Sequence, residues 1–175
     1  MVFDAVVLAG GRAERLGGAD KAGLEVDGTP LLERALAAVA EAGQVVVVGD
    51  ERPASREVRW VREEPAYGGP VAAAYAGRAE LTGDGQILVL AVDMPDVTAE
   101  TVRRLLDGAL GHDGAVLTDG GRRHLAFAVS TAALDRVRPV PTTGAAMRDL
   151  WSALDLAEVP ARGDEAHDVD SWSDL

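Results

Sequence analysis

Short apolar runs divide the first half of the chain. Val and Ile, which favour strands, are frequent in these runs, and each run is too short for a buried helix. The predicted strands span residues 5–9, 44–49, 57–62 and 87–92. Residues 57–62 alternate apolar and polar positions, whereas the other runs are continuously apolar. Continuous runs of this length are typical of strands that are covered on both faces of a sheet.

Apolar residues at helical spacing separate the predicted strands. A brief strand and turn over 24–30 precede the first helix, which runs from Leu31 until Gly43 stops it. Further helices are expected from Pro70 to about Gly83 and from Thr98 to Gly108. Strands that alternate with helices favour right-handed βαβ units, so the sequence predicts a mostly parallel sheet with helices on both faces.

The pattern changes after Gly108. Residues 115–118 and 125–129 are apolar and flank the turn Asp119-Gly120-Gly121, which predicts an antiparallel pair. The remaining predicted elements are a helix over 143–154, a short edge strand at 158–160 and an acidic tail over 164–175. We therefore expect an α/β fold with a small antiparallel extension, and 175 residues fit a single domain over residues 1–175.

Composition narrows the possible function classes. The 17 Lys and Arg are outnumbered by 29 Asp and Glu, and a net charge of −12 repels the backbone of nucleic acid. No Cys is present, which excludes disulfides, thiolate zinc sites and cysteine nucleophiles. The N-terminus has no basic region before an apolar stretch, and no apolar run approaches the roughly 20 residues of a membrane span. We expect a soluble, cytoplasmic protein with neither nucleic acid nor a membrane as partner.

The segment after the first predicted strand combines glycine with positive charge. Gly10 and Gly11 follow buried residues directly, and Arg12, Arg15 and Lys21, the only lysine of the chain, come after them. Glycine lets backbone N–H groups approach an anion, and several cations in one loop of an acidic protein suit a polyphosphate. The loop matches neither G-x-G-x-x-G nor a Walker loop. A flexible surface loop is the alternative, but a place directly after a buried strand favours a phosphate site.

An acidic residue follows the most apolar predicted strand. Asp93 comes after residues 87–92, so its carboxylate is expected at the carboxyl edge of the sheet, close to the glycine loop. Mg²⁺ is usually held by one or two carboxylates together with phosphate oxygens and water. The alternative is an aspartate that only initiates the turn Asp93-Met94-Pro95.

Several motifs are spread widely along the chain. They are Leu8-Ala9-Gly10-Gly11, Arg15-Leu16-Gly17-Gly18, Asp20-Lys21, Gly69-Pro70-Val71-Ala72-Ala73, Val92-Asp93-Met94-Pro95 and Asp168-Val169-Asp170-Ser171. The first three together resemble the signature L-A-G-G-x-x-x-R-M-G-G-x-D-K of nucleotidyltransferases, and especially of the molybdenum cofactor guanylyltransferases. The others are similar to G-P-L-A-G, C-D-x-P and N-V-N-T of the same family. This resemblance implies a Rossmann-like three-layer α/β sandwich and a Mg²⁺-dependent transfer of a nucleoside monophosphate, with release of pyrophosphate.

The resemblance also implies which residues form the site. The nucleotide-binding residues would be Leu8, Ala9, Gly10, Gly11, Lys21, Glu64 and Asp93. The catalytic residues would be Arg15, Lys21 and Asp93, which stabilise charge on the phosphates. We take Asp93 and Asp170 as the Mg²⁺ ligands, with Asp168 as the alternative to Asp170. A solvated acidic tail and a solvated Glu64 are the alternatives to these roles.

The reaction that the resemblance implies is transfer of GMP from GTP to molybdopterin. Gly10 and Gly11 resemble the pattern of the guanine users in the family. The alternatives are another base or acceptor, as in a cytidylyltransferase of the same cofactor or a sugar-phosphate nucleotidyltransferase, and a nucleotide-binding module without turnover. Aromatic residues make up only 4% of the chain, and Tyr67 and the tryptophans are too scattered to predict a stacking role.

Overall fold

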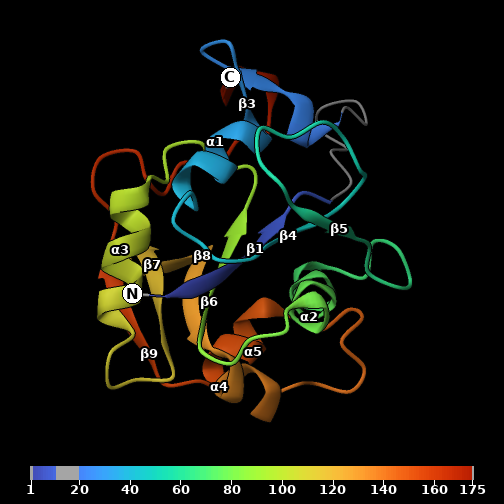
Figure 1. Cartoon of the computed structure of the whole chain (residues 1–175). Helices are drawn as coiled ribbons and strands as arrows, with labels where there is room; N and C mark the ends of the chain where they lie inside the picture. Colours follow the sequence, from blue (N-terminus) through green and yellow to red (C-terminus); the bar gives the residue numbers. More distant parts are fainter. Residues whose placement is uncertain (1, 11–19, 175) are drawn as a thin grey trace.

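The computed structural model describes residues 2–10 and 20–174, and a seven-stranded sheet forms its centre (Figure 1). The strands lie in the order β5-β4-β1-β6-β8-β7-β9. Their bounds are β1 (Phe3–Leu8), β4 (Val45–Val48), β5 (Arg59–Val61), β6 (Gln86–Ala91), β7 (Gly114–Asp119), β8 (Arg122–Ser130) and β9 (Leu156–Pro160). Each strand predicted from an apolar run is present, so the α/β prediction is confirmed.

Strand β8 is the antiparallel member of this sheet. It pairs in antiparallel fashion with β6 on one side and with β7 on the other, whereas β1 pairs in parallel with β4 and β6, and β9 in parallel with β7. The predicted antiparallel pair is therefore confirmed as β7 and β8. The edge strand β9 is also confirmed, and it extends the sheet beyond β7.

Helices cover both faces of the sheet, which gives three layers (Figure 1). On one face lie α1 (Leu31–Ala38) and α3 (Ala99–Gly108), and on the other lie α2 (Pro70–Glu80), α4 (Thr131–Arg136) and α5 (Met147–Ser152). Successive strand residues alternate between the two apolar cores, as Val7 and Val6 do in β1. At Gly77 in α2 an added Cβ would overlap Val6, so a glycine there lets the helix lie close to the sheet.

Three helices differ from the sequence-based expectation, and the first of them, α1, ends at Ala38 rather than near Gly43. Helix α4 was not predicted; it is short, and the side chain of Ser130 caps it by accepting a hydrogen bond from Ala133 N–H. Helix α5 begins at Met147 rather than at residue 143, because Gly144 has a φ of +74°, which lies outside the helical region. The hydrophobic spacing of residues 143–154 therefore overestimates the length of this helix.

The carboxyl ends of β1 and β6 lie next to each other and carry the chain into two loops. Leu8 pairs with Ala91, and Val92 N–H donates to Leu8 C=O at 3.0 Å. Residues 10 and 93, far apart in sequence, therefore emerge at the same edge of the sheet. This is the edge at which open parallel sheets bind their ligands.

The acidic C-terminal segment packs against that edge instead of extending into solvent. Val169 is completely buried in the core that also contains α1 and α3, and its N–H donates to Asp93 C=O at 2.9 Å. A short 3₁₀ helix, η3 (Trp172–Asp174), follows. The solvated-tail alternative is therefore wrong for the part of the segment around Val169.

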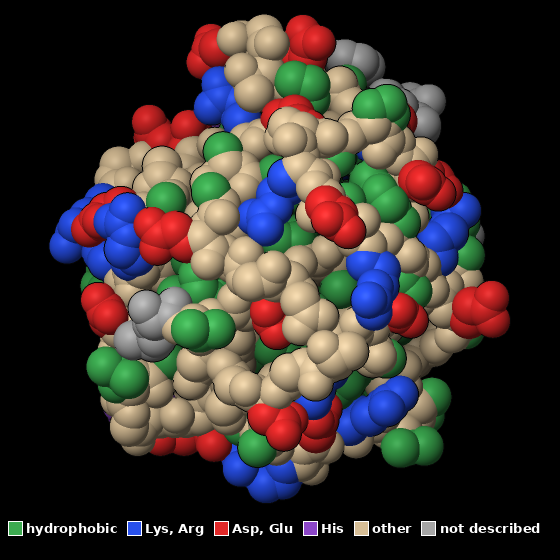
Figure 2. All heavy atoms as spheres, viewed as in Figure 1, with side chains coloured by type: hydrophobic (Ala, Val, Ile, Leu, Met, Phe, Trp, Pro, Cys, Tyr) green, Lys and Arg blue, Asp and Glu red, His purple; other side chains and the backbone are tan. Residues whose placement is uncertain are grey.

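A two-stranded sheet and a mixed surface complete the molecule. The small sheet consists of β2 (Glu25–Val26) and β3 (Thr29–Pro30), joined by a tight turn in which Asp27 and Gly28 both have positive φ. Acidic and basic side chains are interspersed on the face shown in Figure 2. Among the described residues, no helix has the length and hydropathy needed to cross a membrane.

Candidate active site

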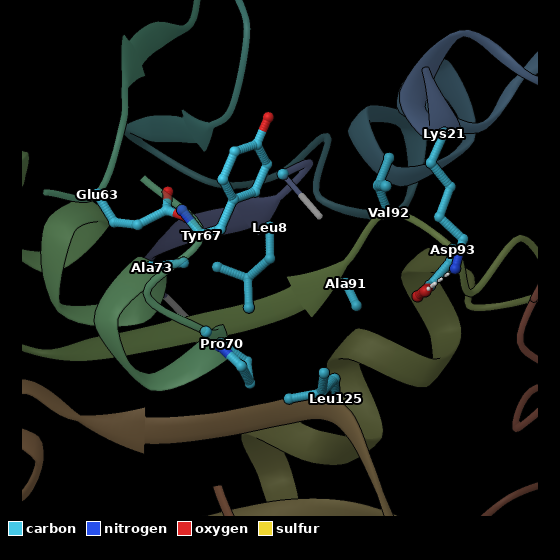
Figure 3. A pocket seen from close by; sticks show the side chains of 12 residues that line it. Leu8, Lys21, Glu63, Tyr67, Pro70, Ala73, Ala91, Val92, Asp93 and Leu125 are labelled. Carbon is cyan, nitrogen blue, oxygen red and sulfur yellow. Dashed lines mark hydrogen bonds and ion pairs between the residues drawn. The ribbon is translucent and has the colours of Figure 1, made fainter. Parts of the chain in front are cut away.

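A cavity of about 550 Å³ opens at the carboxyl ends of β1 and β6 (Figure 3). Much of its wall is apolar and comes from Leu8, Pro70, Ala73, Ala91, Val92 and Leu125. Lys21, Glu63 and Asp93 bring charge to the same cavity. A mostly apolar cavity with a few convergent charged groups is typical of a small-molecule site, and its volume falls in the usual range for one.

Lys21 joins two carboxylates that are distant in sequence. Its Nζ donates to Asp93 Oδ2 at 2.7 Å and to Asp170 Oδ1 at 3.1 Å. Lys21 begins a short 3₁₀ helix, η2 (Lys21–Gly23), whose Ala22 is completely buried. Asp93 stands between the buried Val92 and Met94. Both side chains are therefore presented from anchored backbone.

The electrostatics of Lys21 favour its charged form. Burial lowers the pKa of the Lys21 ammonium, but hydrogen bonds and charge attraction from Asp93 and then Asp170 raise it, and the net pKa lies above the ordinary 10.5. The side chains of Lys21 and Asp93 are 17% and 24% exposed, so this ion pair is largely shielded from water. The side chain of Asp170 is 51% exposed, so it forms the solvent-facing side of the cluster.

The carboxylates of Asp93 and Asp170 fit a divalent cation. Both converge on one positively charged nitrogen, so both can reach a common cation, and carboxylate oxygens are the ligand type that Mg²⁺ prefers. Within residues 2–10 and 20–174, no group of three or more His, Cys, Asp or Glu forms a self-sufficient metal site. This donor set therefore suits a metal that arrives with phosphate oxygens and water as further ligands.

The structure brings Asp170, rather than Asp168, to this cluster. Asp168 Oδ2 lies 3.8 Å from Arg122 Nη2 and so faces the hairpin between β7 and β8. Of the two acidic residues in the closing motif, only Asp170 contacts Lys21 within the described part of the chain.

The buried acidic residue beside the cavity is Glu63. It is 8% exposed, its Oε1 accepts the Tyr67 N–H at 3.0 Å, and its Oε2 faces Gly10. Glu64, which sequence reasoning placed near the nucleotide, is exposed and does not line this cavity. Successive residues of an extended segment point in opposite directions, so a shift by one position exchanges the buried and the solvated side chain.

A smaller, polar cavity of about 170 Å³ adjoins the first one. It shares Gly10, Lys21, Glu63 and Tyr67 with it, and its other walls carry ion pairs. The Arg52 guanidinium makes two hydrogen bonds to the Asp20 carboxylate, and Arg62 Nη1 lies 2.7 Å from Asp50 Oδ1. Both arginines are paired with local acids, whereas Lys21 contacts Asp93 directly.

A backbone N–H group at the end of β1 is already hydrogen-bonded within the sheet. Ala9 N–H donates to Val48 C=O at 2.8 Å, so this donor is not available to a ligand without breaking the sheet. Among the described residues, an added Cβ on Gly10 would meet Val48 O at 3.6 Å and Glu63 Oε2 at 4.0 Å. Gly11 and Arg15 lie outside the described residues.

Comparisons with known proteins assign this chain to a family. The model of the MobA-like NTP transferase domain matches residues 5–159. The chain belongs to the MobA-like NTP transferase domain family. The match confirms the resemblance inferred from the motifs, and most of the matched range lies within the described fold.

The names of individual relatives are consistent with this family. A molybdenum cofactor guanylyltransferase of Shewanella loihica is 29% identical over 127 residues, which cover 69% of this chain and 64% of that protein. One of Shewanella amazonensis is 25% identical over 171 residues, covering 93% of this chain and 87% of that protein. The chain thus spans less than two thirds of the first relative. A nucleotidyl transferase structure from Methanothermobacter has a TM-score of 0.79 at 24% identity, with 99% of this chain and 94% of that chain covered, so it supports the fold.

Tyr67 is a candidate site residue to which the sequence analysis assigned no role. The residue is 53% exposed, and its side chain lies beside Glu63 at the edge of the cavity (Figure 3). Its φ of +62° is unusual for a bulky residue and costs about 1–3 kcal/mol. No periodicity marks a lone tyrosine in a loop, although its place before the Gly-Gly-Pro that starts α2 was a usable signal.

Proposed function

We propose that this MobA-like protein is a nucleotidyltransferase that transfers GMP from GTP to molybdopterin, with Mg²⁺ and release of pyrophosphate. The observation that carries the proposal is the convergence of Lys21, Asp93 and Asp170 beside a nucleotide-sized cavity. The names of the curated relatives support the choice of acceptor and nucleotide.

The proposed chemistry is a direct displacement at phosphorus. A phosphate oxygen of the acceptor attacks the α-phosphorus of GTP, the bond from the α-phosphorus to the bridging oxygen breaks, and pyrophosphate leaves with that oxygen. The Lys21 ammonium stabilises the negative charge that develops on the phosphate oxygens. Asp93 and Asp170 would hold Mg²⁺, which supplies further neutralisation of phosphate charge when bound. The reaction therefore needs no nucleophilic side chain.

Glu63 supports guanine as the base. An ionised carboxylate only accepts hydrogen bonds, and the Watson–Crick edge of guanine presents two neighbouring N–H donors. The corresponding edge of cytosine presents one amino donor beside two acceptors, which a carboxylate disfavours. Glu63 is buried beside Gly10, so water has little access to its carboxylate. A ligand that donates hydrogen bonds to this carboxylate is therefore favoured.

The first test is pyrophosphate release by the purified protein with Mg²⁺. We expect release with GTP plus molybdopterin, and at most background release with ATP, CTP or UTP or without the acceptor. Release with CTP in place of GTP would assign the cytidylyltransferase alternative. Tight GTP binding without release in any mixture would instead assign a nucleotide-binding module and overturn the proposed transfer.

Tyr67 is expected to contribute to binding of the base. Replacing Tyr67 by alanine removes the aromatic ring, and we expect GTP affinity to fall about tenfold, since base stacking on a protein ring contributes about 1–3 kcal/mol. Tyr67→Phe keeps the ring and should bind GTP like the unmodified protein. Titration of each variant with GTP measures both effects. Unchanged affinity of Tyr67→Ala would remove the ring from the binding site.

A further inference from the structure

A buried acid lies between helix α3 and the C-terminal segment, away from the cavity described above. Glu165 is 9% exposed. Its Oε1 accepts a hydrogen bond from Thr101 Oγ1 at 2.7 Å, and its Oε2 accepts one from Arg162 N–H at 2.7 Å and another from Arg104 Nη2. One carboxylate thus joins two residues of α3 to the beginning of the C-terminal segment.

Arg104 strengthens this connection from the helix side. The side chain of Arg104 is 14% exposed, and its Nη1 donates to Pro160 C=O at 2.9 Å, at the end of β9. Burial raises the pKa of the Glu165 carboxyl, but hydrogen bonds from Thr101, Arg162 and Arg104 lower it, and the net pKa is below the ordinary value. Glu165 is therefore ionised at neutral pH and makes charge-assisted hydrogen bonds, which are the stronger kind.

The segment fixed in this way leads directly to the active-site cluster. Four residues after Glu165, the buried Val169 donates its N–H to Asp93 C=O, and the next residue, Asp170, accepts a hydrogen bond from Lys21. Glu165 touches neither Lys21 nor Asp93 in the described structure. Its effect on the cluster must therefore pass through the backbone of residues 166–169.

Electrostatics favour such an anchor. Asp93 and Asp170 place two negative charges at one cation, and the segment around them also carries Asp164 and Asp168 in a chain with a net charge of −12. Repulsion between these charges disfavours the position of Asp170 beside Asp93. Asp170 itself is half exposed, and its own contacts, to Lys21 and from its N–H to Asp174 Oδ2 at 3.1 Å, lie at the surface, where such contacts contribute little. The buried contacts of Glu165 offset this repulsion.

We propose that Glu165, through Thr101 and Arg104, is a positioning residue that keeps Asp170 at the Lys21–Asp93 cluster. The consequence for metal binding rests on the function proposed above, whereas the consequence for the backbone does not. Loss of the anchor lets residues 166–170 move away from the edge of the sheet. The metal then loses Asp170, one of its two protein ligands, whereas Glu63 and the cavity wall stay in place.

Two variants and a matched control test the positioning role. Glu165→Gln removes the negative charge at constant size, and Arg104→Met removes its partner while keeping an apolar side chain. The control is Asp113→Asn, because Asp113 also accepts one backbone N–H, from Asp155 at 2.9 Å, and one guanidinium, from Arg136 at 2.7 Å. Asp113 lies at the opposite end of the sheet, next to the start of β7. Glu165→Gln and Arg104→Met lose the same shielded ion pair, and Asp113→Asn loses one whose arginine is 58% exposed.

The first readout is amide hydrogen exchange at Val169, and the second is Mn²⁺ affinity of the protein without nucleotide. We expect Val169 exchange to accelerate and Mn²⁺ affinity to fall about tenfold in Glu165→Gln and Arg104→Met, as is typical when a residue that orients a metal ligand is lost. In turnover assays, the Mg²⁺ concentration for half-maximal rate should rise by a similar factor while the KM for GTP stays unchanged. Asp113→Asn should change none of these quantities.

The outcomes separate this inference from the proposed function. Unchanged Val169 exchange in both variants, or equal acceleration in Asp113→Asn, overturns the positioning role whatever the activity. If the unmodified protein shows no turnover with any nucleotide, the proposed function fails, and exchange at Val169 together with Mn²⁺ affinity still decides the role of Glu165. Should one variant fail to fold, the other carries the test.

Discussion

Replacing Asp93 by asparagine is expected to lower the rate of Mg²⁺-dependent pyrophosphate release on the order of 10³-fold. The amide keeps the shape of the side chain but loses the charge that attracts a metal. Among the described residues, Lys21 then retains the half-exposed Asp170 as its ionic partner. Asp93 also accepts the Val169 N–H through its backbone carbonyl, a contact that the substitution preserves. The measurement is initial rate against Mg²⁺ concentration, together with a thermal unfolding curve.

Asp4→Asn provides the matched control for this prediction. Asp4 lies in the same sheet, in the first half of β1, and its carboxylate accepts the Gln44 N–H at 2.8 Å at the edge opposite the cavity. It should change the stability of the protein but leave the rate within about twofold. Equal rates for Asp93→Asn and the unmodified protein would contradict a role of Asp93 in metal binding.

The order of strands and helices was predictable because continuous apolar runs mark the strands and apolar residues at helical spacing mark the helices. The four valines of β4 are all buried, and β6 carries five buried residues in sequence, so both strands must be covered on each face. Glycine and proline then mark the ends: Pro70 starts α2 and Gly108 ends α3. Local sequence and global fold agree at these positions, which is why pattern alone suffices there.

The elements that pattern missed depend on contacts beyond the local sequence. Helix α4 contains only six residues and owes its start to the Ser130 cap, and the length of α5 is limited by the backbone of Gly144. The C-terminal segment is acidic and has little apolar character, so its composition indicates solvent. Its position comes from Glu165 and from Val169, whose partners lie on α3 and after β6.

The candidate site residues also divide into those that the local sequence predicts and those that depend on the fold. Lys21 and Asp93 were predictable because each follows from a feature of its own: a single lysine in a glycine-rich loop and an aspartate at the end of a buried strand. The structure places both in contact. The choice between Glu63 and Glu64 was not predictable, since neighbouring glutamates differ only in which one faces the core, and that depends on how residues 63–67 turn.

Replacing Lys21 by methionine is expected to lower turnover on the order of 10²–10³-fold and to weaken GTP binding. Methionine retains most of the side-chain length but cannot donate to Asp93 or stabilise charge on a phosphate. The raised pKa of Lys21 means that the ammonium is charged throughout the neutral range. Its contribution to stability is fully present below its unfolded pKa and is lost only as the pH rises through the higher folded pKa, above 10.5. The loss of rate in Lys21→Met should therefore be independent of pH around neutrality.

Arg136→Met is the control for removing one positive charge from an acidic protein. Arg136 pairs with Asp113 at 2.7 Å on α4, far along the sheet from the cavity, so its loss should leave GTP affinity unchanged. Lys21→Met also leaves Asp93 and Asp170 facing each other without a cation between them. Because repulsion between the two carboxylates then favours any added cation, Mn²⁺ should bind this variant at least as tightly as the unmodified protein, even though turnover is lost. Loss of both Mn²⁺ binding and turnover would indicate that Lys21 organises the carboxylates, and would contradict a role confined to the phosphates.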